Sequence, residues 1–153
     1  MAATPNDGRT AMELDPDNPV LALCAAGMAV AGDAVAATDF FARAWAARAD
    51  DFEAAVAAHY VARVQATVAE KLAWDARAAS HAEGARAAGD ARVDGLLASL
   101  YLNLGGGLLE QGRRAEAREA AARAEAALDF LPEDGYRAFV AGAIARLQGR
   151  IET

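Results

Sequence analysis

Apolar and small residues recur along this chain at intervals of three and four, the period of one face of an α-helix. The pattern is interrupted at glycines and aspartates, and all four prolines lie outside residues 20–131. Because proline breaks a helix interior, this long stretch fits helices joined by short turns. We expect Asp50 or Asp51 to cap the third helix and Thr67 to cap the fourth. The pattern predicts helices over about residues 18–31, 33–48, 51–66, 68–88, 89–112, 113–130 and 136–147, with a linker at 131–135.

Two stretches of the chain share one spacing of large, apolar, small, large, glycine and alanine positions. The first stretch carries Leu21, Cys24, Ala25, Met28, Gly32, Ala37, Phe41 and Ala44. The second carries Tyr101, Leu104, Gly105, Leu108, Gly112, Ala117, Ala121 and Ala124. The small residue, Ala25 or Gly105, would let the paired helix approach closely. The glycine four residues after the last large one would end the first helix in a left-handed cap.

This pattern resembles the tetratricopeptide repeat, a helix–turn–helix unit of about 34 residues. The resemblance covers about residues 12–131 and is strong in the two outer units. The stretch from Gly32 to Gly112 is longer than two standard repeats, so the middle unit would have longer helices. Its block of His59, Tyr60, Arg63 and Gln65, followed by Glu70 and Trp74, is also similar to short actinobacterial proteins of this class, and that similarity implies no activity.

The resemblance implies an all-α fold of about three helical hairpins plus a C-terminal capping helix. We expect one domain over residues 12–150 and a disordered tail over residues 1–11. A terminal helix would cover the open end of the last hairpin. Its apolar face would carry Tyr136, Phe139, Val140, Ile144 and Leu147.

Composition narrows the classes of function. Alanine, the strongest helix former, is the commonest residue, and the net charge is −7, from 22 acidic and 15 basic residues. That balance disfavours binding to nucleic acid, because proteins that bind nucleic acid cluster lysines and arginines on one surface. The lone Cys24 excludes an intrachain disulfide, and we expect it to be a buried apolar residue. The polar first residues predict no signal peptide, and no apolar run is long enough for a membrane span, so a cytoplasmic, soluble protein is expected.

The sequence predicts no catalytic site, no cofactor and no metal. Its two histidines, His59 and His81, lie on different helices without a clustered pair of carboxylates. Ser80 and His81 are neighbours on one helix and point about 100° apart, which is poor geometry for proton transfer. The Gly105–Gly107 triplet is no phosphate loop, because no Lys-Ser or Lys-Thr follows it. Gly105 has a packing role, whereas Gly106 and Gly107 have none unless a backbone or a ligand approaches them.

The first helices of the hairpins, and not the two tryptophans, give the candidate site. Trp45 and Trp74 follow helical apolar spacing and are expected in the core. In the resembled architecture, the first helices line a concave groove. Its predicted lining is Ala22, Ala26, Ala29, Val56, Tyr60, Arg63, Leu102, Asn103, Gly106 and Glu110.

Three residues of this lining could hold an extended peptide. Tyr60 would supply an amphipathic contact, Arg63 a fork for a carboxylate, and Asn103 a donor and an acceptor for a peptide bond. The resemblance implies a peptide contact for Asn103. The competing interpretation places Tyr60 in the core, with its hydroxyl reaching a partner, and pairs Arg63 with an acid on a neighbouring helix.

These patterns favour a non-catalytic scaffold that binds a protein or peptide, and they do not name the partner. The alternative is a structural homo-oligomer, such as a homodimer, that self-associates through the apolar groove. A third hypothesis is a helical protein that binds a small molecule or acts as an enzyme. No lysine falls on the first helices, so the sequence does not favour an adaptor for acidic C-terminal tails.

Overall fold

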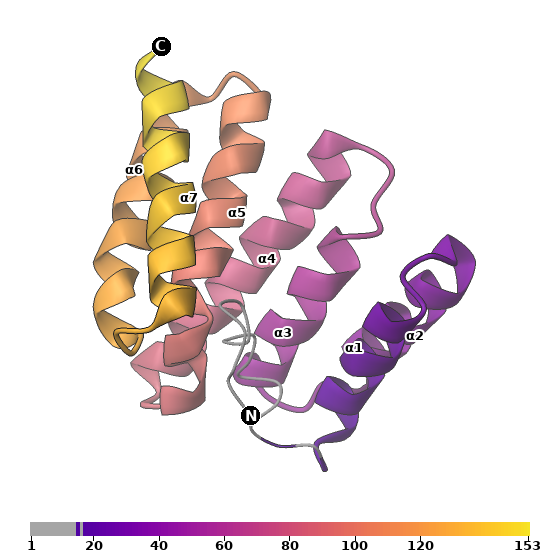
Figure 1. The fold of residues 1–153 in the computed structure, drawn as a ribbon. Coiled ribbons are helices and arrows are strands. Elements are labelled where there is room, and N and C mark those ends of the chain that lie inside the picture. Colours follow the sequence, from indigo (N-terminus) through magenta and orange to yellow (C-terminus); the bar gives the residue numbers. More distant parts are fainter. Residues whose placement is uncertain (1–14, 16) are drawn as a thin grey trace.

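The computed structural model describes Asp15 and residues 17–153, and over this part of the chain it contains helices and no strand. Figure 1 shows their arrangement. The α-helices are α1 (Pro19–Ala29), α2 (Ala34–Ala47), α3 (Asp51–Ala62), α4 (Val68–Ala87), α5 (Leu97–Glu110), α6 (Arg114–Ala127) and α7 (Gly135–Glu152). Two 3₁₀ segments, η2 (Ala91–Gly95) and η3 (Leu128–Phe130), raise the number of helical elements above the expected three hairpins and terminal helix. The predicted tail over residues 1–11 lies outside the described residues.

Side-chain caps explain where most of these helices begin. The Asn18 side chain accepts hydrogen bonds from the backbone N–H groups of Val20 and Leu21. Asp50, not Asp51, caps α3 by accepting from the Glu53 N–H at 2.8 Å. Thr67 caps α4, as predicted.

Glycine ends only one of the two aligned first helices in the predicted way. Gly112 has φ +73° and closes the turn after α5 in the left-handed region. Gly32 does not adopt a positive φ, so a left-handed cap there is wrong. The predicted fifth helix is also wrong at its start, because residues 91–95 form the separate segment η2.

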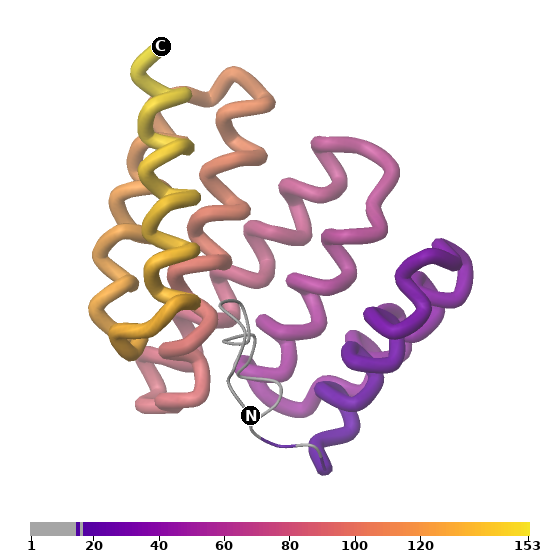
Figure 2. Tube along the Cα trace, viewed as in Figure 1, coloured from indigo at the N-terminus to yellow at the C-terminus, as the bar shows by residue number. Residues whose placement is uncertain are grey.

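The α-helices pack chiefly against their neighbours in sequence. The most extensive packing lies within the pairs α3–α4, α5–α6 and α1–α2, and α6 packs on α7. Between the pairs, α2 packs on α3 and α4 packs on α5. Figures 1 and 2 show α4 lying between α3 and α5. The first helix of the third pair therefore packs mainly on the second helix of the pair before it.

The core corrects two predicted contacts. Cys24 is fully buried, as predicted, but Ala25 is exposed and Gly27 makes the close approach to α2. A Cβ on Gly27 would lie 2.3 Å from Cε1 of Phe41. On α7, Phe139 is 56% exposed and does not belong to the buried face. That face consists of Val140, Ile144, Leu147 and Ile151.

No helix in the described part of the chain is long and apolar enough to cross a membrane.

Candidate functional site

A polar cavity of about 270 Å³ lies where α3, α4 and α5 meet. We call it the α3–α5 pocket, and its lining residues are His59, Ala62, Arg63, Lys71, Asp75 and Asn103. Two of the three predicted site residues, Arg63 and Asn103, therefore come together in one cavity. The third, Tyr60, does not line it.

Arg63 is the exposed cation of the α3–α5 pocket. It stands at the C-terminal end of α3, where the first residue after the helix leaves its side chain at the surface. Within the described residues its guanidinium pairs with no acid, so the predicted pairing with a neighbouring helix is wrong. Its Cζ lies 6.0 Å from the centre of the Tyr60 ring. The guanidinium is thus held loosely over an aromatic ring, with its donors available to a ligand.

Asn103 and His59 form the inner wall of the pocket. The two side chains approach to 3.4 Å between Asn103 Nδ2 and His59 Nδ1. Burial, together with the positive charges of Arg63 and Lys71, lowers the pKa of His59 to about 4. The imidazole is therefore neutral at neutral pH, so its Nδ1 can accept a hydrogen bond from the Asn103 amide. The Asn103 amide oxygen accepts no hydrogen bond from the described residues.

Lys71 and Asp75 were missed by the sequence analysis, although their spacing is that of a helical ion pair. Lys71 Nζ donates to Asp75 Oδ2 at 2.6 Å, and Asp75 is only 2% exposed. Burial raises the pKa of Asp75, and the hydrogen bond from Lys71 opposes that rise. The two charges neutralise each other, so the net positive charge of the pocket comes from Arg63.

Tyr60 belongs to the core, which is the competing placement from the sequence. It is 8% exposed, and its ring lies 5.4 Å from the ring of Phe41 and 4.9 Å from that of His59. The prediction that Tyr60 offers a surface contact to a ligand is wrong. The Tyr60 ring instead packs edge to face against the His59 ring.

The rest of the predicted groove lining is mixed in exposure. Val56 is buried, whereas Ala22, Ala29 and Glu110 are exposed and Ala26, Leu102 and Gly106 are half-buried. Gly107 now has a packing reason, because a Cβ there would meet Cδ1 of Leu72 on α4 at 3.1 Å. Gly106 has none, since a Cβ there would meet nothing within 4 Å.

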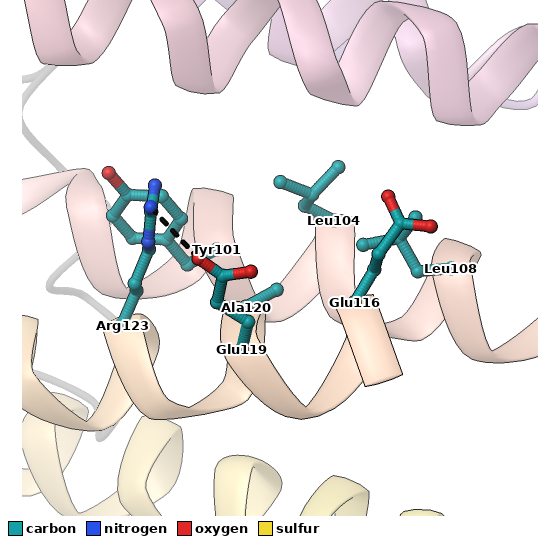
Figure 3. A pocket seen from close by; sticks show the side chains of 7 residues that line it. All are labelled: Tyr101, Leu104, Leu108, Glu116, Glu119, Ala120 and Arg123. Carbon is teal, nitrogen blue, oxygen red and sulfur yellow. Dashed lines mark hydrogen bonds and ion pairs between the residues drawn. The ribbon is translucent and has the colours of Figure 1, made fainter. Parts of the chain in front are cut away.

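A second cavity, of about 170 Å³, lies between α5 and α6 (Figure 3). Its lining residues are Tyr101, Leu104, Leu108, Glu116, Glu119, Ala120 and Arg123. The charges around it are already paired. The Tyr101 hydroxyl donates to Glu83 at 2.6 Å, and Arg123 reaches both Glu83 and Glu119, the latter by the dashed contact in Figure 3. Burial and the hydrogen bond to Glu83 raise the pKa of Tyr101 to about 12. This cavity offers a ligand fewer free polar groups than the α3–α5 pocket.

Both histidines and the single cysteine of the chain lie within the described residues. No three His, Cys, Asp or Glu side chains come together there as metal ligands would. His81 contacts Asp51, with 2.8 Å between Nδ1 and Oδ1. Burial raises the pKa of the Cys24 thiol to about 12, so the thiol is protonated at neutral pH. In comparisons with known proteins, no family model, curated protein or solved structure matches this chain.

Proposed function

We propose that this protein is a non-catalytic scaffold that binds a protein or peptide partner at the α3–α5 pocket. The observation that carries the proposal is that two polar groups of this pocket, on Arg63 and Asn103, remain available to a ligand. The Arg63 guanidinium has no acidic partner, and the Asn103 amide oxygen has no donor, among the described residues. An unpaired guanidinium beside an amide suits a carboxylate followed by a peptide bond.

The pocket is arranged for binding without rearrangement. The Asn103 amide is oriented by a neutral His59, and Asp75 fixes the Lys71 ammonium at the rim. Side chains that are already held lose little entropy when a ligand arrives. We infer that an extended segment lies across the end of α3, with its carboxylate on Arg63 and its backbone on Asn103.

A tetratricopeptide-like arrangement of hairpins is part of the proposal. It is supported by the buried alanines of both aligned stretches and by Gly105. A Cβ on Gly105 would meet Leu147 Cδ2 at 2.9 Å and Ala120 Cβ at 3.5 Å. The exposed Ala25 and the packing of α5 on α4 depart from a regular repeat.

The test is affinity capture from native cell extract with the full chain as bait. Arg63→Ala and Asn103→Ala should each abolish capture of the partner while the free energy of unfolding changes by less than about 1 kcal/mol. Arg150→Ala, which removes an exposed arginine of α7 far along the chain from the pocket, is the control and should capture normally. Capture that follows only the folded fraction of each variant would contradict a binding role for Arg63 and Asn103.

One observation favours the alternative of a homo-oligomer. Helix α1 has no charged residue, yet Ala22, Ala25 and Ala29 are exposed. An apolar helix usually has its faces covered. Light scattering of the purified chain separates the two hypotheses, because the scaffold is monomeric without its partner and the homo-oligomer is not.

A further inference from the structure

The two tryptophans of the chain form a surface that the α3–α5 pocket does not include. Trp45 of α2 and Trp74 of α4 were expected in the core, but each is only half-buried. Their rings meet edge to face, with 5.0 Å between centroids. This is a favourable aromatic geometry that joins the second helices of two successive hairpins.

An arginine stands over each tryptophan. The Cζ of Arg48 lies 3.7 Å from the Trp45 ring centre, and that of Arg77 lies 4.3 Å from the Trp74 ring centre. Arg48 is fixed further, because its Nη1 donates to the Trp45 carbonyl at 2.6 Å. We call Arg48, Trp45, Trp74 and Arg77 the tryptophan–arginine surface. Stacking on the rings orients both guanidinium groups while both remain exposed.

The charges of this surface are not neutralised. Neither Arg48 nor Arg77 pairs with an acid within the described part of the chain. Asp50 and Asp51 line one cavity with Arg48, and both of these carboxylates, like that of Glu53, bind other groups. Asp50 is bound by Arg92 at 2.9 Å, Asp51 by His81 at 2.8 Å, and Glu53 by Asn18 at 3.0 Å. Two arginines without an acidic partner among the described residues therefore lie over two half-buried tryptophan rings, on a chain whose net charge is −7.

We propose that the tryptophan–arginine surface is a second docking site, and that its occupant is an acidic segment of a protein partner. Carboxylates of the segment bind the outward N–H groups of Arg48 and Arg77, and an aliphatic side chain between them packs on the tryptophan edges. The charge of the two arginines selects an acidic occupant over a basic one. The surface shares no residue with the α3–α5 pocket, so the proposal does not depend on the proposed function.

The site carries its own reporter, because Trp45 and Trp74 are the only tryptophans in the sequence. The probes are a short peptide of glutamate and leucine, the same peptide with lysine in place of each glutamate, and an oligothymidylate. The glutamate peptide should change the tryptophan fluorescence saturably, and its Kd should rise with salt concentration. The lysine peptide and the oligothymidylate should bind at least about tenfold more weakly.

Variants assign the binding to the two arginines. Arg48→Gln and Arg77→Gln should each raise the Kd of the glutamate peptide about tenfold, the loss expected for one charge-assisted contact. Arg43→Gln is the matched control. Arg43 lies on α2, and its guanidinium, like that of Arg48, lies over an aromatic ring, that of Phe40, but Arg43 is paired with Asp39. Its removal should leave the Kd unchanged.

A charge-reversal variant distinguishes loss of binding from loss of folding. The double variant Arg48→Glu with Arg77→Glu should bind the lysine peptide in preference to the glutamate peptide, which an unfolded chain could not do. The proposal is overturned if the glutamate peptide gives no saturable response. It is equally overturned if the oligothymidylate binds as tightly, or if both single variants keep the original Kd.

Discussion

Replacement of Gly27 by alanine tests the closest contact in the core. The new Cβ would lie 2.3 Å from Cε1 and 2.7 Å from Cδ1 of Phe41, well inside van der Waals distance. The Phe41 ring is 2% exposed and packs against Tyr60 at 5.4 Å, so it has little room to move away. Overpacking of this kind costs about 1–3 kcal/mol, and the better helix propensity of alanine offsets about 1 kcal/mol. A net loss of up to about 2 kcal/mol should lower the melting temperature by up to about 8 °C.

Gly106→Ala is the matched control, because the same substitution in another helix meets nothing within 4 Å. There only the propensity gain remains, so stability should rise by about 0.5–1 kcal/mol and the melting temperature by about 1–4 °C. Chemical denaturation followed by circular dichroism gives both free energies. Adding Phe41→Leu to the Gly27→Ala variant should cost less than the sum of the single changes, since the clashing ring is gone. A Gly27→Ala protein as stable as Gly106→Ala would refute the assigned α1–α2 contact.

Two further predictions concern the helix contacts and the pH response. Gly105→Leu should lower the unfolding free energy by about 1–3 kcal/mol, because the new side chain must displace Leu147. Ala25→Leu, at an exposed site, should change the unfolding free energy by less than about 0.5 kcal/mol. Equal shifts of the melting temperature in the two variants would contradict this difference. His59 is held neutral in the folded state by a pKa of about 4 against 6.5 for a free histidine, so the unfolded chain binds a proton first as pH falls. The unfolding free energy should therefore decline from about pH 6.5 and level off near pH 4, at no more than about 1.4 kcal/mol per pH unit, and His59→Gln should remove this part of the slope in denaturation series.

Features set by local chemistry were predictable from the sequence. Thr67 and Asp50 cap helices because each has a backbone N–H within three residues to satisfy. Gly112 closes a helix because its φ suits a residue without a side chain. The segment η2 was missed, and it is tied down by a distant contact, that of Arg92 with Asp50.

The orientation of the helices was harder to predict, and the reason lies in their composition. Helix α1 has no charged residue, and residues 54–58 in the middle of α3 are all apolar, so periodicity cannot say which face of these helices turns inward. Gly27, and not Ala25, faces α2, because the Phe41 ring on α2 leaves no room for a Cβ at that position. The same ambiguity placed Tyr60 in the groove when it packs in the core.

The candidate site was predicted in part. Arg63 and Asn103 were nominated and do share a cavity, although their role in binding stays a prediction. The Lys71–Asp75 pair was readable from its spacing. Its burial was not, because that depends on how α5 packs over α4.

Packing between neighbours along the chain has a consequence for how the molecule folds and opens. Since most of the packing joins helices that are adjacent along the chain, loop-closure costs are small and folding should be fast for a chain of this length. The same pattern lets the molecule open from its ends. Helices α1 and α2 can separate from α3 while α5, α6 and α7 stay packed, so backbone amides should exchange with solvent soonest in α1 and α2 and last in α4 and α5.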